Sequence, residues 1–237
     1  MTLTYDLTER QQTLLPFTEG ITVFEGRKGS GKSTSAVALL WYLREEFGLP
    51  SVCDFPLKEA FGEAEFFDLK IFIENLRFIA QHFKASEDSS ARKAVDELME
   101  KGKIPKIVQK AIFLDEGYQY ADSREPGAKD VKLFGYWIQQ IRHFQSPLIM
   151  VVPHLDMIDK RVRRQVDRVL TCETWTEPDG TRWTYAVGDD ISLDEQVELY
   201  VNASVFQEMF DSWVLTPIRG AGRGLTNERT GEDIDAE

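Results

Sequence analysis

The sequence is poor in cysteine and contains no long apolar run. Its two cysteines, Cys53 and Cys172, each lie in an apolar stretch, which argues against a disulfide framework and predicts buried, reduced thiols. No window of about 18 consecutive apolar residues is present, so we expect no membrane-spanning helix and no direct membrane insertion. The start, MTLTYDLTERQQTLLPF, lacks a basic segment followed by an apolar one, so we expect no signal peptide.

Positive charge is also scarce. The chain has 28 Lys and Arg against 40 Asp and Glu, a formal net charge of −12. This balance argues against nucleic-acid binding through overall charge, because non-specific affinity comes from neutralising phosphates. Part of the excess lies in residues 220–237, which contain almost nothing apolar and carry four acids and no base after Arg229. We expect this tail to be disordered and residues 1–219 to form a single domain.

A glycine-rich loop follows the short apolar run ITVFE and leads into a periodic helix. The loop, GRKGSGKS, fits the phosphate-binding pattern G-x-x-x-x-G-K-[ST] in its expected strand-to-helix context. Glycines let consecutive N–H groups point inward, and the helix N-terminus adds positive potential. We expect Lys32 to reach the outer phosphates of ATP and Ser33 to bind Mg²⁺, the alternative being a turn without a ligand. The predicted nucleotide-binding residues are Gly26, Arg27, Lys28, Gly29, Ser30, Gly31, Lys32, Ser33 and Thr34.

A second site motif is the apolar run AIFL, which ends in Asp115 and Glu116. We expect Asp115 to bind Mg²⁺ and Glu116 to act as the catalytic base on a water that attacks the γ-phosphate. This pair indicates hydrolysis and disfavours a small-molecule kinase, whose base must face a substrate hydroxyl. A plain strand end is the alternative for this motif taken alone.

Apolar runs alternate with helical segments along the chain. This order predicts an α/β fold with a mostly parallel sheet covered by helices on both faces. A helical insertion is expected over 58–109, and alternating runs around Pro178-Asp179-Gly180 predict a β-hairpin over 170–188, appended to the sheet. The residues after Leu193 predict a helix, with a final strand as an addition. The predicted strands are 21–25, 50–55, 110–116, 147–153 and 168–175, and the predicted helices are 33–47, 131–144 and 158–167.

The motif order GRKGSGKS, IFLDEGYQYADSRE and IRHFQSPLIMVVPHLDMIDKRVR resembles the FtsK-HerA superfamily of motor ATPases. The resemblance is strongest to the genome-packaging ATPases of double-jelly-roll viruses and their zonular-occludens-toxin-like relatives, and it covers about residues 20 to 175. It implies an additional-strand, RecA/FtsK-like P-loop NTPase sheet and a polar γ-phosphate sensor at the end of the strand beside the catalytic acid. His154 stands where that family usually has Gln, and the alternative role for His154 is to cap the loop after the strand.

The resemblance also implies a homo-oligomeric ring, in which an arginine from a neighbouring subunit stabilises charge on the transferred phosphoryl group. Arg124 and Arg142 are the first candidates for this catalytic finger, with Arg163 behind them. Arg27 is a candidate for touching the γ-phosphate from within the same subunit. For each finger candidate, an exposed position or a structural ion pair is the alternative.

The densest basic run of the chain is DKRVRRQVDR. If it is helical, Ile158 and Val166 bury one face, and a basic stripe lines another face. Repeated around a ring, such a stripe would bind a DNA backbone without reading its sequence. A solvated helix face or a charged subunit interface is the alternative. The predicted DNA-binding residues are Arg161, Arg164 and Arg168.

The sequence therefore predicts a Mg²⁺-dependent ATPase that forms a ring, translocates DNA and packages a viral genome into a preformed capsid. Its expected partners are DNA and the proteins of a capsid vertex or portal, and its expected location is the host cytoplasm or the virion. The alternatives are a zonular-occludens-toxin-like assembly or export ATPase, a P-loop kinase for a small substrate, and a nucleotide-binding structural protein with little turnover. DNA-stimulated hydrolysis distinguishes the motor from the others.

Overall fold

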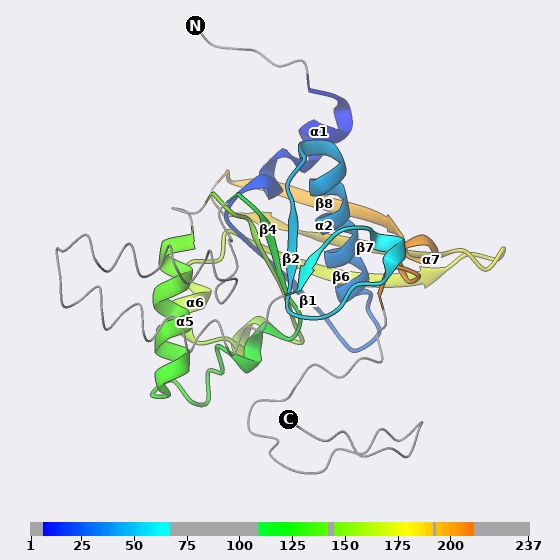
Figure 1. Ribbon diagram of the computed structural model, residues 1–237. Helices are drawn as coiled ribbons and strands as arrows, with labels where there is room; N and C mark the ends of the chain where they lie inside the picture. The colour runs from blue at the N-terminus through cyan, green and yellow to red at the C-terminus, as the bar shows by residue number, and fades with distance from the viewer. Residues whose placement is uncertain (1–6, 67–108, 142–144, 192, 211–237) are drawn as a thin grey trace, which may run out of the picture.

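The computed structural model describes residues 7–66, 109–141, 145–191 and 193–210 (Figure 1). They form one sheet of eight strands in the order β3-β2-β4-β5-β1-β6-β7-β8. The strands from β3 to β6 are parallel, and β7 and β8 continue the sheet antiparallel. The strands are β1 Ile21–Glu25, β2 Ser51–Cys53, β3 Glu65–Phe66, β4 Ala111–Leu114, β5 Leu148–Val152, β6 Arg168–Thr176, β7 Arg182–Asp190 and β8 Glu195–Asn202.

Helices cover both faces of this sheet (Figure 1). One face packs against α1 (Glu9–Leu14), α2 (Lys32–Phe47) and α7 (Ala203–Phe206). The other face packs against α5 (Lys129–Gln140) and α6 (Lys160–Arg163). The α/β class and the mostly parallel sheet are therefore confirmed. The described 3₁₀ turns are η1 Leu15–Thr18, η2 Glu59–Phe61, η3 Gly117–Gln119 and η5 Leu155–Met157.

The position of β5 decides the strand arrangement. It pairs with β1 on one side and with β4 on the other, so it separates the strand before the glycine-rich loop from the strand that ends in Asp115 and Glu116. This is the predicted additional-strand order. Since all three strands are parallel, their carboxyl ends lie at the same edge of the sheet.

The apolar side chains of α5 and of Ile141, which follows it, pack against the sheet. Phe134, Trp137, Ile138 and Ile141 are all buried against the sheet. Both cysteines are buried and unpaired, and burial raises the pKa of each thiol to about 12. Among the described residues, no helix is long and apolar enough to cross a bilayer.

Four sequence-based expectations about the elements are corrected. The 170–188 hairpin exists, but it is no appendage, because β6 pairs with β1 and β8 pairs with β7 in the same sheet. Residues 195–202 form a strand and not a helix, since their alternate apolar side chains are buried. Glu65–Phe66 is a strand within the expected helical insertion, whose residues 67–108 lie outside the described ranges. The helix expected over 158–167 is reduced to the four residues of α6.

The described chain reaches Phe210, so both the boundary at residue 219 and the tail 220–237 lie outside it. Within the described part, the hairpin tip between β6 and β7 projects from the body of the molecule (yellow in Figure 1).

Candidate nucleotide-binding site

The glycine-rich loop connects the carboxyl end of β1 to the start of α2. Gly26, Gly29 and Gly31 all have positive φ angles, of 146°, 81° and 88°. At Gly31 there is also no room for a side chain, because an added Cβ would lie 2.4–2.5 Å from atoms of Thr174 and Thr184. The predicted loop therefore forms at the N-terminus of a 16-residue helix, where free N–H groups attract anions.

Lys32, the first residue of α2, folds its side chain back over the loop. Its Nζ donates to the carbonyl oxygens of Gly26 and Arg27, both at 2.9 Å. Partial burial lowers the pKa of Lys32, and the nearby carboxylates of Asp115 and Glu116 act against this shift. The amino group thus lies inside the loop curve, where a phosphate of a nucleotide would take over its hydrogen bonds.

The two motifs meet across the sheet. The hydroxyl of Ser33 donates to Oδ1 of Asp115 at 3.4 Å, although the residues are 82 positions apart in the sequence. Asp115 follows β4 directly, and Ser33 lies in the first turn of α2. The predicted pair for Mg²⁺ is therefore brought together by the fold.

Glu116 adopts a left-handed backbone conformation, with φ of 50°. Such a conformation is uncommon for a residue with a side chain and is often found at functional sites. Its Oε2 accepts hydrogen bonds from Nε2 of Gln119 at 2.7 Å and from the hydroxyl of Tyr118 at 3.2 Å. These two partners were missed at the sequence level, where the run DEGYQY gives only their proximity along the chain.

A further residue of the site, Asp54, was also missed. It follows β2 directly and is 5% exposed. Its Oδ1 accepts a hydrogen bond from the backbone N–H of Asp115 at 2.9 Å, and its Oδ2 is buried with no partner among the described residues. Burial raises the pKa of Asp54 well above its usual value, and the hydrogen bond from the N–H of Asp115 acts against this shift. An acid directly after a short buried strand was the available signal.

These carboxyl groups fit a divalent cation. Burial, together with the charge of Glu116, raises the pKa of Asp115 to about 6, so the site is short of positive charge. Within the described ranges, no three His, Cys, Asp or Glu side chains form a metal cage on their own. Ser33 and Asp115 would therefore hold Mg²⁺ jointly with nucleotide phosphates, which is a common arrangement for this ion.

Comparison with known protein families found no match, and no curated protein matches. Solved structures, in contrast, match the fold of this chain. The N-terminal domain of zonular occludens toxin from Neisseria meningitidis covers 81% of this chain and 98% of its own length, at 15% identity and a TM-score of 0.50. The genome packaging NTPase B204 from Sulfolobus turreted icosahedral virus 2, in complex with AMPPCP, covers 76% and 97%, at 14% identity and a TM-score of 0.48.

The fold is that of the P-loop NTPases. The predicted likeness to zonular-occludens-toxin-like ATPases is thus confirmed for the fold. At these identities it establishes the fold alone, so the roles of individual residues rest on the geometry of this chain.

The loop that carries His154 borders the P-loop. The N–H of Gly26 donates to the carbonyl of Pro153 at 3.4 Å, and the N–H of Leu155 donates to Oε2 of Glu25 at 2.8 Å. The imidazole itself is 66% exposed, and its Nδ1 accepts from the N–H of Asp156 at 3.1 Å. The capping alternative is therefore observed, and the sensor role stays a prediction.

The candidate arginine fingers differ in their contacts. Arg124 is 75% exposed and forms a forked ion pair with Asp122 of its own chain. Arg163 pairs with Asp156, and Arg27 is exposed within the P-loop. Arg142 lies outside the described residues. The finger role stays a prediction for each of them.

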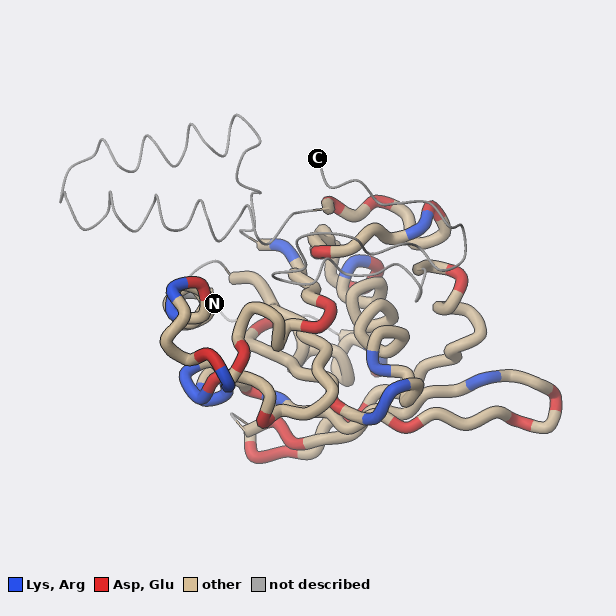
Figure 2. Tube along the Cα trace, turned by 90° about the horizontal axis from the view of Figure 1, so that it is seen from below, with Lys and Arg blue, Asp and Glu red and all other residues tan. Residues whose placement is uncertain are grey.

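The predicted stripe of Arg161, Arg164 and Arg168 along one helix face is wrong. Helix α6 ends at Arg163, so the i, i+3, i+7 spacing has no helix to act on. Arg168 is 3% exposed and forms a buried ion pair with Asp190. Arg161 pairs with Asp159, whereas Arg164 is exposed and makes no ion pair within the described chain. Figure 2 shows acidic residues interspersed with the basic ones.

Strands β6 and β7 support the P-loop from the side, a contact missed at the sequence level. Nη2 of Arg182 donates to the carbonyl oxygen of Gly29 at 3.2 Å. The hydroxyls of Thr174 and Thr184, 3.2 Å apart, lie against Gly31. Arg182, Thr174 and Thr184 therefore hold the loop on the side that faces β6 and β7.

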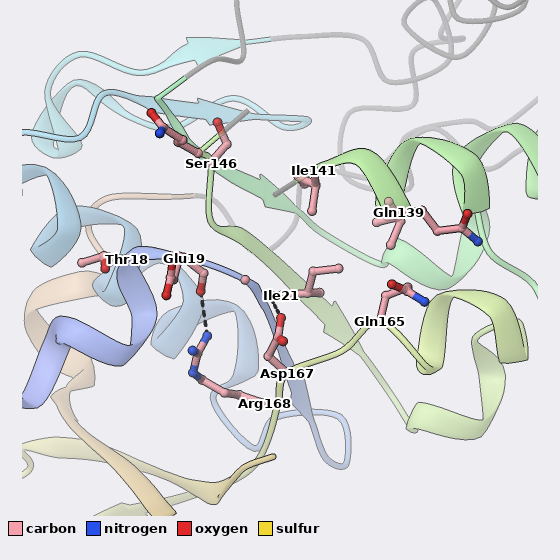
Figure 3. A pocket seen from close by; sticks show the side chains of 12 residues that line it. Thr18, Glu19, Ile21, Gln139, Ile141, Ser146, Gln165, Asp167 and Arg168 are labelled. Carbon is pink, nitrogen blue, oxygen red and sulfur yellow. Dashed lines mark hydrogen bonds between the residues drawn. The ribbon is translucent and has the colours of Figure 1, made fainter. Parts of the chain in front are cut away.

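A hollow of about 490 Å³ lies at the opposite edge of the sheet, at the amino ends of β1, β5 and β6. Figure 3 shows its wall, where Arg168 donates to the carbonyl of Glu19 and Asp167 accepts from the N–H of Ile21. These polar groups already have partners within the wall. Because the hollow lies at the amino ends of the strands, it is separate from the P-loop site at their carboxyl ends.

Proposed function

We propose that this protein hydrolyses Mg·ATP and uses the energy to translocate DNA, packaging a viral genome into a preformed capsid. The observation that carries the hydrolytic part is the meeting of Ser33 and Asp115 at 3.4 Å beside the positive end of α2, with Glu116 next in the chain. A phosphate loop, a cation-binding pair and a base are then all present at one edge of the sheet.

The chemistry assigns one task to each group. Lys32 and the loop N–H groups bind the phosphates, since the loop is already curved around the amino group of Lys32. Mg²⁺, when bound, would neutralise charge on the phosphates. Glu116 takes the proton of the attacking water, and Gln119 and Tyr118 keep its carboxylate in place. His154 lies on a loop next to the P-loop, so it is the candidate that responds to the γ-phosphate.

The translocase part rests on the motif order of the sequence and on exposed basic residues. Lys160 and Arg164 are exposed at the two ends of α6 and make no ion pair within the described chain, so they are free to neutralise DNA phosphates. Arg124 is exposed enough to reach a neighbouring subunit. A homo-oligomeric ring bound to a capsid vertex or portal would place these groups on a common channel.

The test is steady-state ATP hydrolysis with and without duplex DNA, for the wild type, Glu116→Gln and the control Glu125→Gln. Glu125 is exposed beside Arg124, and its side chain makes no described hydrogen bond or ion pair with the P-loop, Asp115 or Glu116. We expect DNA-stimulated hydrolysis in the wild type and in the control. In Glu116→Gln we expect the hydrolysis rate to fall by a factor of about 10² to 10⁴, because a general base accelerates a reaction by about that factor. Binding of ATP should remain in this variant.

Hydrolysis that ignores DNA would overturn the translocase. It would favour an assembly or export ATPase, the alternative whose structural relative is the zonular occludens toxin domain. Phosphate transfer to a small acceptor in place of water would favour the kinase. Full activity in Glu116→Gln would refute the assignment of the base, whatever DNA does.

A further inference from the structure

Asp54 is tied to β4 by both its main chain and its side chain. The pairing of β2 with β4 ends at Cys53 and Phe113. Beyond that pair, the N–H of Asp54 donates to the carbonyl of Phe113 at 3.2 Å, and its Oδ1 accepts from the N–H of Asp115 at 2.9 Å. The side chain thus extends the sheet pairing by one step, to the residue that carries the cation-binding carboxylate.

The second oxygen of Asp54 needs an explanation. It is fully buried and has no hydrogen-bond partner within the described chain. A buried acceptor without a partner is costly, and native structures rarely keep one without a reason such as a bound water or ion. Fixing the N–H of Asp115 needs a single oxygen, so this contact does not account for the second.

We propose that Asp54 is a positioning residue of the divalent-cation site. One oxygen holds the backbone of Asp115, so that its carboxylate stays beside Ser33. The other oxygen offers an acceptor to a water of the hydrated cation. This inference rests on the proposed function, because it assumes that the P-loop site binds Mg²⁺ together with a nucleotide. It gives Asp54 no contact with the reacting phosphate.

Three variants distinguish the roles of the two Asp54 oxygens from the effect of changing any buried polar side chain on β2. Asp54→Asn keeps an oxygen for the N–H of Asp115 but replaces the second oxygen with a donor. Asp54→Ala removes both acceptors. Ser51→Ala is the matched control, because Ser51 lies three positions earlier on β2, is 3% exposed and also has a buried hydroxyl without a partner.

The measurement is binding of a fluorescent ATP analogue, titrated with Mg²⁺ and repeated in EDTA, with thermal unfolding of the nucleotide-free protein alongside. Groups that orient metal ligands are typically worth 10- to 100-fold in metal affinity. We therefore expect Asp54→Ala to raise the Mg²⁺ concentration at half-saturation about tenfold or more. Asp54→Asn should raise it several-fold. Affinity in EDTA should be unchanged, and Ser51→Ala should match the wild type.

Equal losses with Mg²⁺ and in EDTA would show a merely structural role and overturn the inference. If Asp54→Ala does not fold, Asp54→Asn decides, and wild-type half-saturation in that variant would also overturn it. A wild-type protein whose nucleotide binding ignores Mg²⁺ would refute the proposed function first. The two failures are thus distinguishable.

Discussion

The central parallel strands and the antiparallel extension form one sheet but are built differently. Strands β4, β5 and β1 are four or five residues long and buried on both faces, apart from Glu25 at the end of β1. Strands β6, β7 and β8 pair antiparallel with one another, although β6 is parallel to β1; they are eight or nine residues long and alternate between buried and more exposed side chains. The first group has helices on both faces, whereas the second has one covered face and one facing solvent.

The two parts of the sheet contribute differently to the candidate site. The carboxyl ends of the parallel strands carry the acids and the P-loop, because parallel strands bring such ends to one edge. The antiparallel extension contributes none of the predicted catalytic residues. It holds the P-loop from outside through Arg182, Thr174 and Thr184. Three substitutions test this division, starting with the junction between β6 and β7.

The largest effect is expected for Arg168→Ala. It removes the guanidinium that pairs with the fully buried carboxylate of Asp190, which then keeps its hydrogen bond from the N–H of Leu193 but loses this ion pair. We expect a loss of about 3–5 kcal/mol in the free energy of unfolding, measured with urea. The exposed control, Arg164→Ala, should change stability by less than about 0.5 kcal/mol. Equal stabilities in the two variants would contradict the structural role of Arg168.

Gly31→Ala tests whether the antiparallel strands press on the P-loop. The substitution adds a methyl group at positive φ that collides with Thr174 and Thr184. Strain and overpacking together predict that the free energy of unfolding falls by about 2–4 kcal/mol. ATP binding should also be lost. Gly29→Ala is the control, because Gly29 has similar φ but open space around its added Cβ. In this control the free energy of unfolding should fall by only about 1 kcal/mol. Matching losses would show that φ alone matters and that the contact does not.

Arg182→Ala should have the smallest effect. It removes the hydrogen bond to the carbonyl of Gly29 and no group that faces the phosphates. One such bond is worth about 0.5–1.5 kcal/mol, so the free energy of unfolding should fall by about that amount, and ATP binding should weaken by no more than about two- to tenfold. Calorimetric titration with ATP would measure it, beside Arg164→Ala. A hundredfold loss would instead place Arg182 on the nucleotide itself.

Much of the candidate site, namely the P-loop with Asp115 and Glu116, could be predicted because the sequence patterns that indicate it are local. The P-loop follows from eight consecutive residues, and the pair Asp115 and Glu116 follows from its position after an apolar run. Short apolar runs and helical periodicity located β1, β2, β4, β5, β6 and α2 nearly to the residue. Each of these features depends on neighbours in the sequence, so no knowledge of the sheet was needed.

The errors arose where partners lie far apart along the chain. Arg168 fits a basic stripe by spacing, but the helix ends at Arg163 and Arg168 begins a strand opposite Asp190. Residues 195–202 are apolar enough for a helix, yet a free edge of β7 selects the strand. Neither outcome is encoded by periodicity, because each depends on which element lies alongside.

The sequence by itself determined that a phosphate loop and an acid pair follow two buried strands of an α/β protein. Only the tertiary structure decided that β6, β7 and β8 extend the same sheet, that Asp54 holds Asp115, and that Arg182 holds the P-loop. The physical reason is that backbone geometry and apolar patterns act over a few residues. The order of strands in a sheet, in contrast, is set by packing among segments that are distant in sequence.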